Sequence, residues 1–176
     1  GSGNYNEVKQ GDNEFKKDEG ETVITGESEE HTVTIDTSGG KVDVTFDDLK
    51  IDVSGKTEVD GSGDGPARES KATVTVQGGG DATIELDGKN ELKSGGYNAG
   101  LEKNDEMSED GETISGTLTI KDDNDTKGAL TAEGGEGGAG IGGGAERTGS
   151  NITIRGGTIE AVGGAGAAGI GDGVGA

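Results

Sequence analysis

The stretch that decides the fold is written twice near the C-terminus, as ALTAEGGEGGAGI at residues 129–141 and as TIEAVGGAGAAGI at residues 158–170. Each copy begins with residues that alternate apolar and polar, which is typical of a half-buried β-strand. Each then passes through a glycine-rich corner and ends on one isoleucine. A shorter version of the corner, GGYNAGL, stands at residues 95–101. Such recurrence predicts a repeat protein whose units stack on one another.

Four short tetrads carry the same alternation elsewhere in the chain. Their first residues lie 41, 44 and 34 positions apart, and they are Thr32–Ile35, Thr73–Val76, Thr117–Ile120 and Asn151–Ile154. After the first two tetrads, a glycine-rich turn leads to VDVTFD at residues 42–47 and to ATIELD at residues 82–87, which align residue for residue. Because side chains alternate between the two faces of a strand, the apolar members should point inward. We expect one common inward-facing row made of Ile35, Val76, Ile120 and Ile154.

Composition narrows the fold class. Only 26% of the 176 residues are hydrophobic, 39 are glycine, and the single proline excludes collagen. A net charge of −21 with so few apolar residues is typical of disorder, but here the apolar residues fall in short strand-like runs. Stacked rungs let a small number of aliphatic residues form continuous ladders. The sequence predicts an all-β chain, a right-handed parallel β-helix (β-solenoid) of about four to five coils with long loop insertions, the hand following the crossover rule.

The domain boundaries follow from the same pattern. Residues 1–20 are charged and weakly patterned, and we expect a flexible N-terminal lead or cap there. Residues 21–176 form the repeat domain. The last residues, GDGVGA, contain no polar capping element. We therefore expect either that coils continue beyond residue 176 in the natural protein, or that another molecule covers the open end by self-association.

Charge and cysteine content exclude several function classes. A polyanion repels phosphate backbones and anionic lipid surfaces, so neither nucleic acid nor a membrane surface is an expected partner. The absence of cysteine excludes disulfides and cysteine-ligated metal sites. No apolar run reaches the roughly 18 residues of a membrane helix, so we expect no membrane insertion. The acidic surplus is either a solubilising surface or a source of ligands for Ca²⁺.

The candidate site residues are calcium ligands and one aromatic. Oxygen-bearing side chains gather in the turn at Asp122, Asn124 and Asp125, as a hard cation requires, although Lys127 occupies the place where an EF-hand loop needs glycine. Asp60 and Asp64 form a second candidate pair. A solvated polar turn is the alternative for both. Tyr97 is the one aromatic in a repeat corner, and it either stacks on a sugar ring or packs locally.

Three further segments carry a family resemblance. They are VTFDDLKIDVSG at 44–55, LKSGGYNAGL at 92–101, and GAGIGGG at 138–144 followed by NITI at 151–154. In this order they resemble the glycine-rich right-handed parallel β-helix domains of large surface proteins from anaerobic Gram-positive bacteria, over about residue 21 to the end. The resemblance implies a secreted or cell-surface bacterial location, contact with polysaccharide or host glycan, and adhesin-like behaviour. The acidic insertions at 60–65 and 122–125 depart from it.

Two hypotheses about function follow. The first is a non-catalytic structural or adhesive element of the cell surface. The second is a carbohydrate-binding module for polysaccharide, bridged by Ca²⁺ where the polysaccharide is itself anionic. A polysaccharide lyase or hydrolase is a third reading, since β-helices host such enzymes, but carboxylate pairs arise by chance among 36 acidic residues. We therefore expect no enzyme and no catalytic residues.

Overall fold

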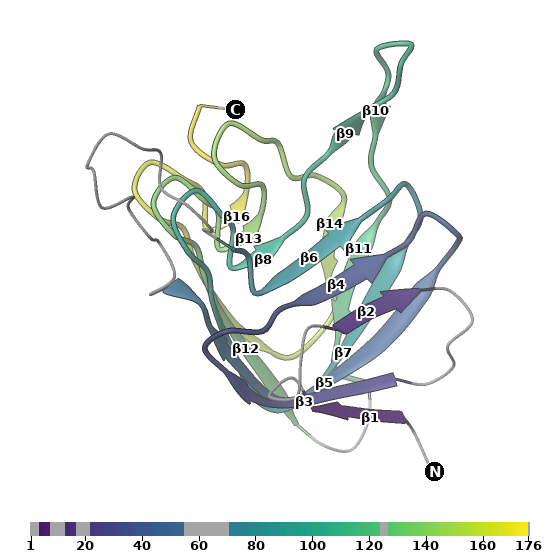
Figure 1. Cartoon of the computed structure of the whole chain (residues 1–176), viewed down its shortest axis with the longest axis vertical. Helices are drawn as coiled ribbons and strands as arrows, with labels where there is room; N and C mark the ends of the chain where they lie inside the picture. Colours follow the sequence, from purple (N-terminus) through teal and green to yellow (C-terminus); the bar gives the residue numbers. More distant parts are fainter. Residues whose placement is uncertain (1–3, 8–12, 17–21, 55–70, 124–126, 176) are drawn as a thin grey trace.

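The structure is a computed structural model that describes residues 4–7, 13–16, 22–54, 71–123 and 127–175 (Figure 1). These residues form an all-β chain with no helix. The larger sheet contains β1 (Asn4–Glu7), β3 (Thr22–Ser28), β5 (Val42–Asp52), β7 (Ala82–Lys93), β11 (Leu118–Lys121), β12 (Gly128–Glu133), β14 (Ile152–Ile154) and β15 (Thr158–Val162). The smaller sheet contains β2 (Asn13–Lys16), β4 (Val33–Asp36), β6 (Val74–Gln77), β8 (Leu101–Glu102), β13 (Ile141–Gly142) and β16 (Ile170–Gly171).

Every pairing within these two sheets is parallel, and the chain alternates between them. We call one passage through the larger sheet and then the smaller sheet a circuit. Successive circuits lie side by side, so each strand pairs with its counterpart from the circuit before. The one antiparallel pair among the described residues is the hairpin of β9 (Glu106–Met107) and β10 (Thr113–Ile114), which projects away from both sheets (Figure 1).

Rows of aliphatic side chains run across the circuits and form the core. In the smaller sheet, the register aligns Val33, Val74, Leu101, Ile141 and Ile170. In the larger sheet, it aligns Val44, Ile84, Ile120 and Ile154. Every member is buried except the two in the last circuit, Ile154 and Ile170. Since each residue covers the next along its row, 26% hydrophobic residues are enough for a continuous core.

The expected single row of four tetrad residues is wrong. Ile35 does align with Val76, and Ile120 aligns with Ile154, but the two pairs lie in different sheets. The third tetrad pairs with the second strand of the preceding repeat, so that Ile120 lies beside Ile84. The place beside Val74 is taken by Leu101, at the end of the glycine corner. The alternation that identifies a strand is the same in both sheets, so it could not assign a tetrad to one of them.

The two sequence alignments are confirmed by the register. The segment 42–47 pairs with 82–87 without a shift, and 129–133 pairs with 158–162 as the repeat predicts. The long strands β5 and β7 each bend at one corner, where Asp48 has φ 49° and Gly88 has φ 67°. In the later circuits this corner separates β11 from β12, and β14 from β15.

Residues 1–20, for which a lead or cap is expected, contribute β1 and β2. The first pairs with β3 and the second with β4, both parallel. Phe15 on β2 is buried in the core. Phe15 pairs with Ile35, so one row of the smaller sheet extends into the first circuit.

Candidate functional site

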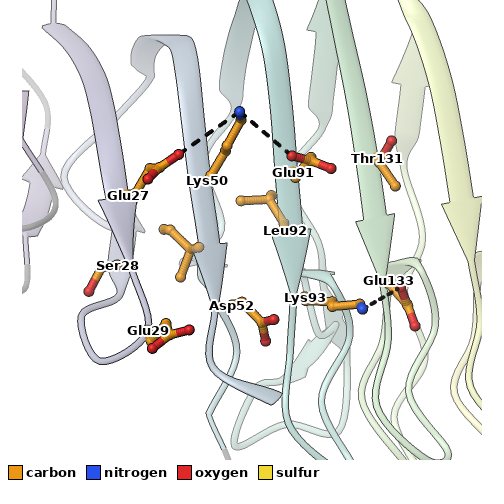
Figure 2. A pocket seen from close by; sticks show the side chains of 11 residues that line it. Glu27, Ser28, Glu29, Lys50, Asp52, Glu91, Leu92, Lys93, Thr131 and Glu133 are labelled. Carbon is orange, nitrogen blue, oxygen red and sulfur yellow. Dashed lines mark ion pairs between the residues drawn. The ribbon is translucent and has the colours of Figure 1, made fainter. Parts of the chain in front are cut away.

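An open groove of about 570 Å³ lies along the second halves of the long strands, near the end of each. It crosses four strands of the larger sheet, β3, β5, β7 and β12 (Figure 2). Its lining residues are Glu27, Ser28, Glu29, Lys50, Ile51, Asp52, Glu91, Leu92, Lys93, Thr131 and Glu133. This volume is within the range of about 300–1,000 Å³ that is usual for small-ligand sites.

Parallel pairing sets the order of charges along the groove. Glu27, Lys50 and Glu91 are direct neighbours on adjacent strands, because the parallel register pairs Glu27 with Lys50 and Lys50 with Glu91. The Lys50 ammonium lies 3.9 Å from a Glu27 carboxylate oxygen and 4.0 Å from one of Glu91 (Figure 2). In the next row, Lys93 lies 3.7 Å from Glu133. Surface pairs like these contribute about 0–1 kcal/mol each, so they leave these groups free to exchange partners with a ligand.

A second cluster is buried where the hairpin meets the sheets. The Lys103 ammonium donates to Ser115 Oγ at 2.9 Å and to the Ser150 carbonyl at 2.9 Å, and lies 3.7 Å from Asp105 Oδ1. Both charged side chains are nearly inaccessible, at 5% and 7% exposure. The cluster joins residues just after β8, just after β10 and just before β14. It therefore fastens the hairpin to the next circuit.

Burial and hydrogen bonding act in opposite directions on these charges. Burial lowers the pKa of the Lys103 ammonium, and the attraction of Asp105 only partly offsets it. Burial would raise the pKa of the Asp105 carboxyl, but hydrogen bonds from Ser150, Ser115 and Thr148 outweigh it and hold the pKa below its usual value. Asp105 is thus an ionised acceptor whose oxygens are already occupied. The arrangement is that of a structural ion pair, because the lysine is inaccessible to a substrate.

Glu102, the last residue of β8 and the neighbour of Lys103 in the sequence, is also buried. Its Oε1 accepts the N–H of Ala99 at 3.0 Å. Burial raises the pKa of the Glu102 carboxyl, while the hydrogen bonds from Ala99 and Asn104 and the charge of Arg147 oppose the rise. The carboxyl anchors the glycine corner that precedes β8.

The predicted calcium ligands are only partly covered by the structure. Asp60, Asp64, Asn124 and Asp125 lie outside the described residues. Asp122 is described: its Oδ2 accepts the N–H of Gly128 at 3.2 Å, and its Oδ1 is buried with no hydrogen-bond partner among the described residues. Across the same described ranges, no three acidic or histidine side chains come together in a way that could hold a metal ion. The calcium site stays a prediction.

Tyr97 lies in the glycine corner before β8. Its side chain is 57% exposed and its backbone is left-handed, with φ 69°. Its N–H donates to the Glu136 carbonyl at 2.8 Å, and its carbonyl accepts the N–H of Ala145 at 2.9 Å. The backbone of Tyr97 is therefore fixed by the neighbouring circuit while the ring stays accessible. The groove is on other strands, so the structure does not bring Tyr97 and the groove residues into one site.

Sequence reasoning missed both the groove and the lysine cluster. The groove had a readable signal, since Glu27, Lys50, Glu91 and Glu133 occupy outward positions of aligned strands. The lysine cluster had none, because Ser115 and Ser150 are 12 and 47 residues from Lys103 along the chain. They meet only once the circuits are side by side.

Comparison with protein-family models, curated proteins and solved structures found no match to this chain. Within the described ranges, no helix is long and apolar enough to cross a membrane.

Proposed function

We propose that this chain is a non-catalytic, right-handed parallel β-solenoid that serves as a structural or adhesive element, secreted by a bacterium or displayed on its surface. The observation that carries the proposal is the in-register parallel pairing of successive circuits from β2 to β16 and from β3 to β15. Such an array gains length by adding circuits and needs no central globular core. The net charge of −21 supports a solvated outer surface that resists non-specific association.

The described interior also supports a scaffold. The core rows contain aliphatic side chains and Phe15 and Phe46. Among the described residues, the buried charged side chains of Lys103, Asp105 and Glu102 are held by hydrogen bonds. A catalytic centre needs a reactive group that a substrate can reach. In this structure the groups with shifted pKa values near the hairpin are committed to holding the chain together.

Single-molecule stretching between the two ends tests the structural role. If the circuits are stacked units, extension should proceed in steps that release one circuit each. The register spaces equivalent positions of successive circuits by 18 to 41 residues, for example from Asn4 to Thr22 and from Val33 to Val74. Each step should then lengthen the chain by roughly 6–14 nm, at about 3.4 Å per residue. Extension of the whole chain in one event at low force would contradict the proposal.

A second function, binding of a neutral or acidic polysaccharide, is favoured by the groove. Carboxylates and ammonium groups alternate along it at a spacing of one strand, about 4.8 Å, which suits a ligand with repeated hydroxyl groups. Both lysines that could contact a uronic acid, Lys50 and Lys93, line this groove. Ca²⁺ would bridge a polyanion to the remaining carboxylates.

A glycan array separates the two functions. The wild-type chain is applied with millimolar Ca²⁺ and again with EDTA; a module gives a calcium-dependent signal, and a scaffold gives none. The variant Lys50→Ala should lose such a signal. Lys89→Ala is the matched control, because Lys89 is an exposed lysine on β7 that does not line the groove. Equal loss in both variants would place binding elsewhere.

A further inference from the structure

Tyr97 occupies a place in the fold where two later circuits have glycine. The register aligns the residue that follows each corner, Leu101 with Ile141. Counting back from these residues, Tyr97 corresponds to Gly137, and Gly166 has the same place in the third corner. The three backbones agree, with φ of 69° at the tyrosine and of 81° and 78° at the two glycines. The aromatic residue is therefore the exception at a position built for glycine.

The reason that this position favours glycine is the turn around it. In all three corners, the N–H of the next residue donates to a carbonyl three positions back, at 3.1 Å for Asn98, 2.9 Å for Gly138 and 3.0 Å for Ala167. A turn with positive φ at its third residue favours glycine there, because a Cβ crowds the neighbouring carbonyl oxygen. The turn forms without an aromatic side chain in the other two corners. Tyr97 thus adds strain that the turn does not require.

The Tyr97 ring is also not a member of the hydrophobic core. The residue is 57% exposed and lies outside the core cluster. A Cβ at Gly137 would lie 3.9 Å from the ring Cδ1, so the ring lies beside a residue that has no side chain to cover it. A strained residue that the surrounding fold does not require indicates a functional role. The accessible ring face is the part of Tyr97 that can serve one.

Two exposed glutamates flank Tyr97 in the following circuit. The N–H of Tyr97 donates to the Glu136 carbonyl at 2.8 Å, and its carbonyl accepts the N–H of the residue before Glu146 at 2.9 Å. Both glutamates are exposed. Arg147 follows them, but one of its guanidinium nitrogens donates to the Asp105 carbonyl at 3.1 Å, beside the hairpin. The surroundings of the ring are therefore acidic.

We propose that Tyr97 binds an alkylammonium group, held over the ring face with the carboxylates of Glu136 and Glu146 beside it. The face of an aromatic ring is negative and attracts a cation within about 6 Å of the ring centre. The net charge of −21 raises the local concentration of cations around the chain. A quaternary ammonium such as choline and the side chain of a lysine share this chemistry. The site is separate from the groove and does not depend on polysaccharide binding.

NMR of the intact chain, isotope-labelled in its tyrosines, tests the proposal. The sequence has two tyrosines, Tyr5 and Tyr97, so Tyr5→Phe assigns the ring signals. We expect choline chloride to shift the Tyr97 signals, and sodium chloride at the same concentration to leave them in place. The uncharged isostere of choline, in which carbon replaces nitrogen, should also leave them in place. Equal shifts with choline and its isostere overturn the proposal, because the charge would then have no effect.

Two further titrations identify the source of the ammonium group. N-acetyl-lysine methylamide carries a primary ammonium, whereas choline carries a quaternary one. The compound that shifts the Tyr97 ring signals at the lower concentration is the better ligand, and a response to either supports the site. A response to neither overturns it. A response to methyl glucoside without a response to either ammonium compound would assign the ring to sugars and overturn it as well.

Variants locate the contact, with the Asn98 amide signal as the reporter. Tyr97→Phe keeps the ring and should keep the affinity for choline, whereas Tyr97→Leu should weaken it about two- to five-fold. Glu136→Gln and Glu146→Gln should each weaken it roughly two-fold. Glu109→Gln is the matched control, because Glu109 is an exposed glutamate on the projecting hairpin, and this variant should bind like the wild type. Wild-type affinity in Tyr97→Leu contradicts the proposal.

Thermal melting separates a binding role of Tyr97 from a packing role. Tyr97→Gly removes the backbone strain together with the partly buried ring, and these changes act in opposite directions on the free energy of unfolding. We expect a Tm within about 3 °C of the wild type, together with loss of choline binding. A larger fall in Tm would show that the ring holds the fold, and overturns the proposal. No glycan or stretching force is used, so these results and those for the proposed functions fail separately.

Discussion

Truncation of one row at two neighbouring positions tests how the core is held together. Ile141 and Ile170 are adjacent in the same row of the smaller sheet. Ile141 is fully buried between Leu101 and Ile170, whereas Ile170 is 46% exposed. The substitutions Ile141→Ala and Ile170→Ala remove the same atoms. The two positions differ in the exposed fraction of the side chain, which is 0% at Ile141 and 46% at Ile170.

The exposures set the expected magnitudes. Isoleucine to alanine removes the equivalent of three methylene groups, worth about 2.4 kcal/mol when fully buried. At Ile141 a cavity is left as well, which brings the loss of unfolding free energy to about 3–5 kcal/mol. At Ile170 about half of the transfer energy is available and no closed cavity forms, so about 1 kcal/mol is expected. For a chain of this size, these losses lower the Tm by roughly 10 °C and 3 °C.

Urea unfolding followed by circular dichroism measures both losses. The wild type provides the m value against which each variant is compared, since a changed m would indicate altered compactness rather than lost packing. Equal losses at the two positions, or a loss below about 1 kcal/mol at Ile141, would refute the view that each row member is stabilised by the circuits on both sides.

Three further outcomes are expected. Lys103→Met should lower the unfolding free energy by about 3 kcal/mol, because it leaves Asp105 buried without its cation. The double variant Lys103→Met, Asp105→Asn should lose less unfolding free energy than the sum of the two single variants. Additive losses in this double-mutant cycle would show that the two side chains do not interact. Glu102→Gln keeps the hydrogen-bond acceptor and removes a carboxyl whose folded pKa burial raises, so ionisation opposes folding. The variant should melt higher than the wild type above that folded pKa. The difference should shrink as pH falls below the folded pKa and vanish below the ordinary glutamate pKa of the unfolded chain; a pH-independent difference in Tm would contradict this. Gly135→Ala would bring a methyl group into the Gly95 carbonyl of the neighbouring circuit and should cost more stability in thermal melts than Gly111→Ala, which meets no atom within 4 Å and bears only the strain of φ 82°.

Much of the strand pairing could be read from the sequence. The match of VDVTFD with ATIELD gave the register of β5 against β7, because both segments follow a glycine turn of the same length. The repeated corner likewise aligns Leu101, Ile141 and Ile170 in the sequence, and the register places them in one row. In both cases a fixed offset from a glycine turn determined which residues face each other.

Assignment of strands to sheets could not be read in the same way. Leu118 and Ile120 have the same alternation as Val74 and Val76, but the hairpin and its flanking loops separate them, and the intervening Leu101 takes the place beside Val74. Two residues of strand are too few to stand out from a glycine corner by pattern alone. The lysine cluster was unpredictable for a related reason: its members are brought together by tertiary packing and share no local motif.

The bend in the long strands has a consequence for where the sequence can take insertions and deletions during evolution. Between the residues that pair with Lys121 and Gly128, β7 has two residues, 86 and 87, whereas the following circuit has six in its sequence. Where that circuit has eight residues between Ile120 and Ala129, the last circuit has three, 155–157. The ladders on either side keep their register throughout. Insertions and deletions at this corner leave the paired strands beside it in register. New loops can therefore be introduced there in one circuit at a time while the rest of the chain stays the same.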